Sequence, residues 1–336
     1  MKRALKLFLS LLLTVFFLVW AFRGTDFRQQ WESLTRAHYV WLAPYFAVLV
    51  FIHLCRTLRW RYWLTGIETV PFRKVNDASA IGFMMLLILP LRLGEFARPY
   101  LIASRSGIRK SAAMTSVVIE RIVDGITIAV LLRALLFFVP NQGKEVELVR
   151  WGANAMFAIF GGGLVFLLFA LWHQERAVKL IQATAGRIAP GVAHKVADVV
   201  DSFVGAMRHL PGPGGIFGFF LFTAGYWVSN GFGMWLLAKA FDLDLTLFQG
   251  YVVLSVLVVW LMIPAAPGMM GTFQVGTKVG LGLFLPAAVV NDRGLAYANV
   301  MWLCQNAQQI GFGVLFMLLG HVSLKDLGPP PAEATR

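Results

Sequence analysis

The stretch Leu89-Pro90-Leu91-Arg92-Leu93-Gly94-Glu95-Phe96-Ala97-Arg98-Pro99-Tyr100 is the part of this chain from which its organisation can be inferred. It continues an apolar run, 80–91, that is too short to cross a bilayer comfortably. The apolar segment that follows carries more charge inside its hydrophobic length. Together the two regions supply six ionisable groups: Arg92, Glu95, Arg98, Glu120, Arg121 and Asp124. Because charge in hydrocarbon is costly and usually faces a partner or a watery cavity, these groups predict a shared site.

The composition is typical of a membrane protein. The chain has 336 residues, of which 58% are hydrophobic and 14% charged, whereas soluble domains carry roughly a quarter charged residues. Cys55 and Cys304 fall in apolar segments and are expected to be buried thiols. The six His residues are scattered without ligand spacing, so neither a metal nor another cofactor is predicted.

The apolar runs predict a polytopic, all-α transmembrane bundle. Full spans are expected at about 5–22, 39–55, 112–139, 151–172, 216–238 and 295–320. The first is interpreted as a retained helix rather than a signal peptide, because its apolar run is long and no A-x-A cleavage pattern follows. Two further regions, 78–105 and 247–286, are interrupted by proline and glycine and predict re-entrant helical hairpins.

The distribution of Lys and Arg predicts the orientation. With the N-terminus inside, most basic residues fall in inner segments, including Arg56, Arg59 and Arg61 after the second span. This places both termini in the cytoplasm and the chain in the bacterial cytoplasmic membrane. It also explains the net charge of +13 by contact with anionic lipid, so nucleic acid is not an expected partner.

The same topology predicts an inverted repeat. Residues 1–140 form the first repeat and 141–322 the second, with the two hairpins entering from opposite sides. Pro90-x-x-x-Gly94 parallels Pro267-x-x-x-Gly271, and Glu120-Arg121-x-x-Asp124 parallels Gln305-Asn306-x-x-Gln309. Residues 174–210 lie between the first two spans of the second repeat. Their sequence predicts an amphipathic helical hairpin, which would be either a surface anchor or a gate. A disordered cytoplasmic tail is expected at 323–336.

Arg92 and Arg98 are the expected phosphate ligands, since guanidinium groups make two-point contacts to phosphate oxygens. Lys278, with Gln274 nearby, is a further candidate for an anionic ligand. The alternative for Glu120 and Asp124 is an internal salt bridge to Arg92 or Arg98 that fixes the hairpin.

Several motifs resemble one known family. Pro90 to Pro99, Val118-Ile-Glu-Arg-Ile-Val-Asp-Gly125 and Pro264-Ala-Ala-Pro-Gly-Met-Met-Gly-Thr-Phe273 resemble the lysylphosphatidylglycerol synthase transmembrane region, also called flippase-like or UPF0104 proteins. The soluble aminoacyltransferase domain of the multi-domain members has no counterpart in this sequence. The resemblance implies a core site, namely Arg92, Glu95, Arg98, Glu120, Arg121, Asp124, Pro267, Gly268 and Gly271.

These observations predict a non-enzymatic lipid flippase. The expected partners are the bilayer and a phospholipid or a polyprenyl or hopanoid lipid with a phosphate-bearing headgroup; self-association is left open. The full set of candidate site residues adds Gln274, Lys278, Gln305, Asn306 and Gln309 to the nine above. Two alternatives remain: a membrane glycosyltransferase acting on polyprenyl phosphate, and a non-transporting partner of an envelope-lipid enzyme.

Overall fold

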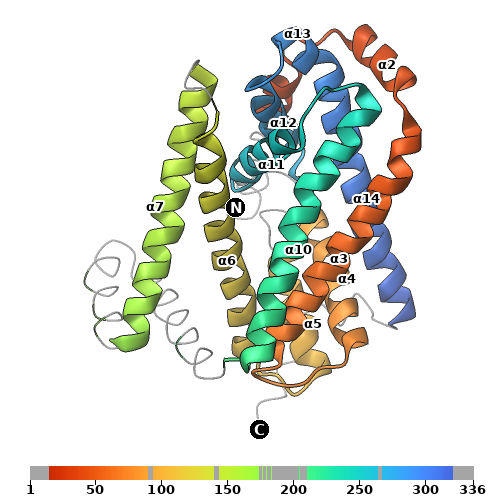
Figure 1. The fold of residues 1–336 in the computed structure, drawn as a ribbon. Helices are drawn as coiled ribbons and strands as arrows, with labels where there is room; N and C mark the ends of the chain where they lie inside the picture. The colour runs from red at the N-terminus through yellow and green to blue at the C-terminus, as the bar shows by residue number, and fades with distance from the viewer. Residues whose placement is uncertain are drawn as a thin grey trace, which may run out of the picture.

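A computed structural model describes residues 15–89, 94–139, 144–173, 210–263 and 267–320, with single positions 176, 179, 183 and 204. The regular elements in these ranges are all helical, which confirms the all-α prediction for this part of the chain. After a helix over 15–22, the α-helices are α2 (Phe27–Arg36), α3 (Leu42–Leu64), α4 (Phe72–Ile88), α5 (Ala97–Arg105), α6 (Lys110–Leu136), α7 (Lys144–Trp172), α10 (Pro213–Ala238), α11 (Leu247–Leu261), α12 (Thr272–Gly282), α13 (Ala287–Val289) and α14 (Leu295–Leu319) (Figure 1). Short helical turns are η1 (Tyr39–Trp41), η3 (Lys239–Phe241), η4 (Pro267–Met269) and η5 (Val290–Gly294).

Local signals in the sequence start several of these helices. The Asp26 carboxylate accepts hydrogen bonds from the backbone N–H groups of Arg28 and Gln29 at the start of α2. Thr246 and Gln249 form a reciprocal capping box at the start of α11. Pro213 is the first residue of α10. Backbone N–H groups in the first turn of a helix have no acceptor within the helix, so the missing N–H of proline costs no hydrogen bond there.

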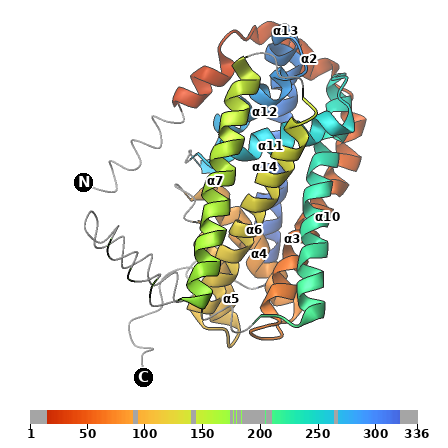
Figure 2. The same cartoon turned by 60° about the vertical axis from the view of Figure 1, so that its left-hand side comes forward.

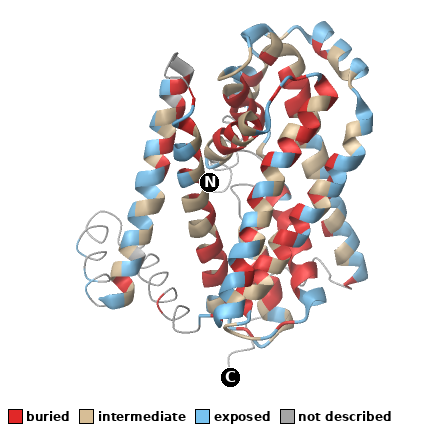
Figure 3. Cartoon of the chain, viewed as in Figure 1, coloured by how far each residue is buried: buried red, intermediate tan, exposed pale blue. Residues whose placement is uncertain are grey.

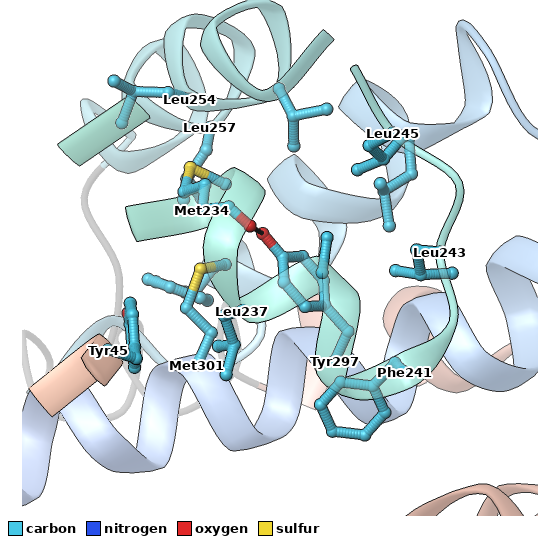
Figure 4. Close-up of a cluster of buried hydrophobic side chains, with 14 of the residues drawn as sticks. Tyr45, Met234, Leu237, Phe241, Leu243, Leu245, Leu254, Leu257, Tyr297 and Met301 are labelled. Carbon is cyan, nitrogen blue, oxygen red and sulfur yellow. Dashed lines mark hydrogen bonds between the residues drawn. The ribbon is translucent and has the colours of Figure 1, made fainter. Parts of the chain in front are cut away.

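The main hydrophobic core joins α3, α10, α11, α12 and α14 (Figure 4). Its members include Tyr45, Leu237, Leu257 and Met301. Tyr297 is fully buried in it, and its hydroxyl donates to the Met234 carbonyl at 2.9 Å. That bond satisfies a polar group that would otherwise destabilise the core.

The two interrupted regions each form a pair of short helices in contact, α4 with α5 and α11 with α12. The pairs occupy opposite ends of the bundle, α4 and α5 at the lower end and α11 and α12 at the upper end (Figures 1 and 2). In the second pair the chain turns at Gly268 and Gly271, whose φ angles are +69° and +87°. Glycine suits both positions because other L-residues rarely adopt such angles.

Contacts between helices recur in matched sets along the chain. α3 with α4 corresponds to α10 with α11, and α5 with α6 corresponds to α12 with α14. Across the two halves, α4 packs on α14 as α11 packs on α6. The same order of neighbours is therefore used twice.

Two stretches among the described residues are long and apolar enough to cross a membrane by length and composition, Tyr39–Leu64 and Val149–Trp172. α6, α10 and α14 have 27, 26 and 25 residues, which at about 1.5 Å per residue exceeds a hydrocarbon core of about 30 Å. α7 stands at the side of the bundle and is mostly exposed or half-buried (Figure 3). Large apolar side chains such as Trp151, Phe157 and Ile159 cover its outer surface.

The second predicted span is too short. The second span was expected to end near residue 55, but α3 continues to Leu64 and carries Arg56, Arg59 and Arg61 within the helix. The predicted hairpin over 174–210 and the tail over 323–336 lie outside the described residues, apart from isolated positions.

Candidate functional site

Two buried acids on α6 are held by arginines from two other helices. The Arg59 guanidinium, on α3, donates to both oxygens of Asp124, Nη1 to Oδ1 at 2.6 Å and Nη2 to Oδ2 at 2.9 Å. Arg59 Nε also lies 3.3 Å from Glu120 Oε1. From α5, Arg98 Nη2 donates to Glu120 Oε2 at 2.9 Å. This network ties α3, α5 and α6 together.

The network is closed to its surroundings. Glu120 is fully buried, and Arg59 and Arg98 are 1% and 3% exposed. Aromatic rings cover the guanidinium groups: Arg98 lies 4.2 Å above Trp60, and Arg59 4.9 Å above Tyr226. Such buried, ring-covered ion pairs are well placed to fix helix positions.

A cavity of about 390 Å³ adjoins this network, within the range of roughly 300–1,000 Å³ typical of small-ligand sites. Its polar lining comes from both halves of the chain: His53, Arg56, Glu95, Arg121, Asp124, Asn230, Gln305, Asn306, Gln308 and Gln309. Apolar side chains complete the wall, among them Leu49, Met156, Leu257 and Phe273. The cavity is therefore lined by charged and polar side chains together with apolar ones.

Arg56 lines the cavity and is held by an aromatic ring and an amide rather than by an acid. Its guanidinium lies 3.3 Å from the centre of the Phe83 ring and donates to Gln309 Oε1 at 3.5 Å. It forms no ion pair with an acid in the described ranges. Arg121, by contrast, lies 3.8 Å from Asp124 Oδ2.

The predicted site residues divide into four groups, the last of which comes from the second helix pair. Seven of them line the cavity: Glu95, Arg121, Asp124, Gly268, Gln305, Asn306 and Gln309. Arg98 and Glu120 lie behind the wall in the ion-pair network, so the predicted internal salt bridge is present and Arg98 is not a cavity ligand in this structure. Arg92 lies outside the described residues.

The residues predicted from the second helix pair lie mostly elsewhere. Lys278 Nζ donates to the Ala21 carbonyl at 2.6 Å, and Gly271 packs against Phe17, so both face the first helix. Gln274 accepts a hydrogen bond from the Gly271 N–H and donates to Asn299. Pro267 begins η4, next to the cavity residue Gly268. In this structure Gly271, Gln274 and Lys278 therefore shape or anchor α12 and do not line the cavity.

Five polar residues at the site were missed from the sequence: His53, Arg56, Arg59, Asn230 and Gln308. His53 hydrogen-bonds Asn76 at 3.0 Å and packs among the rings of Phe83 and Phe312. For the arginines a signal existed: Arg56 and Arg59 directly follow an apolar run, where an inner-interface position was expected instead.

Comparison with known proteins identifies the family. A family model described as "Lysylphosphatidylglycerol synthase TM region" matches residues 7–303. The chain is also 27% identical over 272 residues to a protein named "Glycosyltransferase AglD" from Haloferax volcanii. That match covers 74% of this chain but 43% of the relative, so the chain spans less than half of that protein's length. No solved structure matches the chain. The family match extends over nearly the whole sequence, and the chain therefore belongs to the lysylphosphatidylglycerol synthase transmembrane-region family of membrane proteins.

Proposed function

We propose that this protein is a lipid flippase, a non-enzymatic transporter that moves a lipid with a phosphate-bearing headgroup across the bacterial cytoplasmic membrane. The observation that carries the proposal is the cavity in which Arg56 and Arg121 face an apolar wall. Guanidinium groups bind phosphate oxygens strongly in a desolvated site, and the apolar wall suits the start of acyl chains.

The two-fold use of the same helix contacts supports an inverted repeat of two halves. In transporters with such repeats, the substrate site lies where the halves meet, beside broken helices. Here the cavity is lined by α3, α4 and α6 from the first half and by α10, α11 and α14 from the second. The placement of the helix pairs at opposite ends fits two re-entrant hairpins entering from opposite sides (Figure 1).

A flipping assay tests the proposal. The purified protein is reconstituted into liposomes that contain a trace of fluorescent phospholipid, and the fraction of label that an impermeant reductant quenches reports movement between leaflets. We expect fast movement with the wild-type protein and at least a tenfold slower rate with Arg56→Gln or Arg121→Gln.

The matched control is Arg133→Gln. Arg133 lies on α6, like Arg121, but it is exposed and donates to Asn154 rather than to the cavity. This variant should move lipid at the wild-type rate. Wild-type protein that leaves the inner leaflet unquenched, with correct folding shown by its melting temperature, would overturn the flippase proposal.

A second candidate function follows from the relative's printed name. A glycosyltransferase of polyprenyl phosphate would need to bind the same phosphate in a similar membrane cavity. Incubating the protein with polyprenyl phosphate and radiolabelled nucleotide sugars distinguishes the two: transfer of label to the lipid favours the enzyme, and movement without transfer favours the flippase.

A further inference from the structure

The cavity wall presents buried hydrogen-bond donors that have no acceptor. Four N–H groups of lining residues are buried and unpaired within the described part of the protein: Arg56 Nε, Arg121 Nε, Trp227 Nε1 and Gln308 Nε2. Gln308 and Trp227 are only 5% and 6% exposed. Because a buried donor without an acceptor is destabilising, a ligand that supplies oxygen atoms would bind here at an advantage.

The three carboxylates in and behind the cavity wall already interact within the protein. Asp124 receives two hydrogen bonds from Arg59, and Glu120, behind the wall, is held between Arg59 and Arg98. Glu95 lines the cavity and also interacts within the protein. The charge of each acid is therefore partly balanced before a ligand enters.

The balance of charge points the same way. The described residues in and directly behind the cavity include four arginines, Arg56, Arg59, Arg98 and Arg121, against three acids, Glu95, Glu120 and Asp124. With all of them ionised, the site has an excess of one positive charge. An ammonium group, which only donates hydrogen bonds, would meet donors of its own sign there.

We propose that the site selects a phosphodiester lipid whose headgroup substituent is neutral and rich in hydroxyl groups, and that it disfavours headgroups carrying ammonium groups. This inference rests on the proposed function, since it names the class of lipid that the same cavity takes. The phosphate would meet Arg56 and Arg121. The oxygens of the headgroup substituent would accept hydrogen bonds from Trp227 and Gln308. Its hydroxyl groups would donate to side-chain amide oxygens in the lining, such as that of Asn306.

This chemistry can come from two sources, a diacyl phospholipid such as phosphatidylglycerol or a polyprenyl phosphate sugar. Native mass spectrometry of the detergent-purified protein can compare them as competing ligands. The probes are phosphatidylglycerol, lysylphosphatidylglycerol and phosphatidylethanolamine with identical acyl chains, and a polyprenyl phosphoglucose.

We expect phosphatidylglycerol or the polyprenyl phosphoglucose to bind at least tenfold more tightly than the two ammonium-bearing lipids, and whichever of the two binds more tightly identifies the source. Equal or tighter binding of lysylphosphatidylglycerol would overturn the inference. Tight binding of neither neutral-substituent lipid would overturn it as well.

Variants of the two neutral donors test the assignment within the cavity. Trp227→Phe and Gln308→Leu each remove a donor and keep most of the side chain's bulk, and each should weaken binding of the preferred lipid about threefold to tenfold. The matched control is Trp235→Phe, also on α10 but outside the cavity lining, which should bind like the wild type. Unchanged affinity in both cavity variants would show that these donors do not meet the headgroup.

Failure of this inference is distinguishable from failure of the flippase proposal. Lipid movement in liposomes without the expected headgroup preference would overturn the proposed headgroup selectivity alone. If the protein binds lipids with the expected preference but does not move them between leaflets, the flippase proposal is wrong and the proposed selective site stands.

Discussion

Arg59 and Asp124, on α3 and α6, are joined by two parallel hydrogen bonds of 2.6 and 2.9 Å at a site where the arginine is 1% exposed. A two-point pair of this kind fixes both the distance and the rotation of the two side chains. Since Asp124 also borders the cavity, the pair sets the shape of one cavity wall.

Removing one member of this pair should destabilise the protein strongly. Arg59→Met leaves Asp124 with only the more distant Arg121, 3.8 Å away, and takes one of two arginines from Glu120, a loss that we expect to be about 3–5 kcal/mol. The measurement is the melting temperature in detergent together with monodispersity on gel filtration. Arg61→Met, a charge loss on the same helix at a half-buried position, should change stability far less.

The double variant Arg59→Met with Asp124→Leu refines this test. It removes both charges, while Glu120 keeps Arg98 as its partner. It should therefore be more stable than Arg59→Met alone, because no carboxylate has then lost its hydrogen-bonded arginine without being removed itself or keeping a second one. A double variant that is less stable than the single one would show that the pair contributes through packing rather than charge.

Arg98 gives a second prediction, which differs from its expected role as a phosphate ligand. Arg98→Ala removes a partner of the fully buried Glu120 and uncovers Trp60, so it should lower the melting temperature rather than only impair transport. Combining it with Glu120→Gln should recover part of that loss. An Arg98→Ala protein with wild-type stability but no lipid binding would restore the original assignment.

A third prediction concerns the turn between α4 and α5. A Cβ atom at Gly94 would collide with the backbone of Met85 and Leu86, which cannot move without distorting α4. Gly94→Ala should therefore cost about 1–3 kcal/mol in thermal stability. Gly161→Ala on α7 is the matched control, since its Cβ meets no atom within 4 Å; it should be neutral or slightly stabilising.

Lys278 gives a fourth prediction, because its ammonium donates to the Ala21 carbonyl rather than to the cavity. Lys278→Met should loosen the contact of the first helix with α12 at a cost of about 1 kcal/mol. Lipid binding by native mass spectrometry should stay at the wild-type level. Loss of lipid binding without loss of stability would place this lysine in the ligand site after all.

The sequence predicted the helices better than it predicted the site. The run over 295–320 matches α14, Leu295–Leu319, because composition and period are local signals. The position of Arg59 was not predictable in that way. A charged residue at the end of an apolar run is expected at an interface, and it stays in the bundle here because its partner, Asp124, comes from a helix far along the chain. The burial of this charge depends on a pairing between residues far apart in the sequence, which cannot be recognised from a short stretch of sequence alone.

The last prediction concerns which ends of the bundle face which side of the membrane. α2 lies at the upper end and the start of α6 at the lower end, near α5 (Figure 2). The proposed orientation places the upper end outside and the lower end in the cytoplasm. Arg28, with 90% of its side chain exposed, and the exposed Arg109 are suitable reporters of the two ends.

Single cysteines at these positions, in a background where Cys55 and Cys304 are serine, should react differently with an impermeant maleimide. Arg28→Cys should be labelled in intact cells, and Arg109→Cys only after the membrane is permeabilised. Labelling both in denatured protein controls for expression. The opposite pattern would invert the topology, and labelling of both from outside would show that α3 does not cross the membrane between them. Only labelling of both from outside would remove the basis for two hairpins entering from opposite sides, because that topology requires an odd number of crossings in each half. The opposite pattern reverses which side each end faces and leaves the odd number of crossings in place.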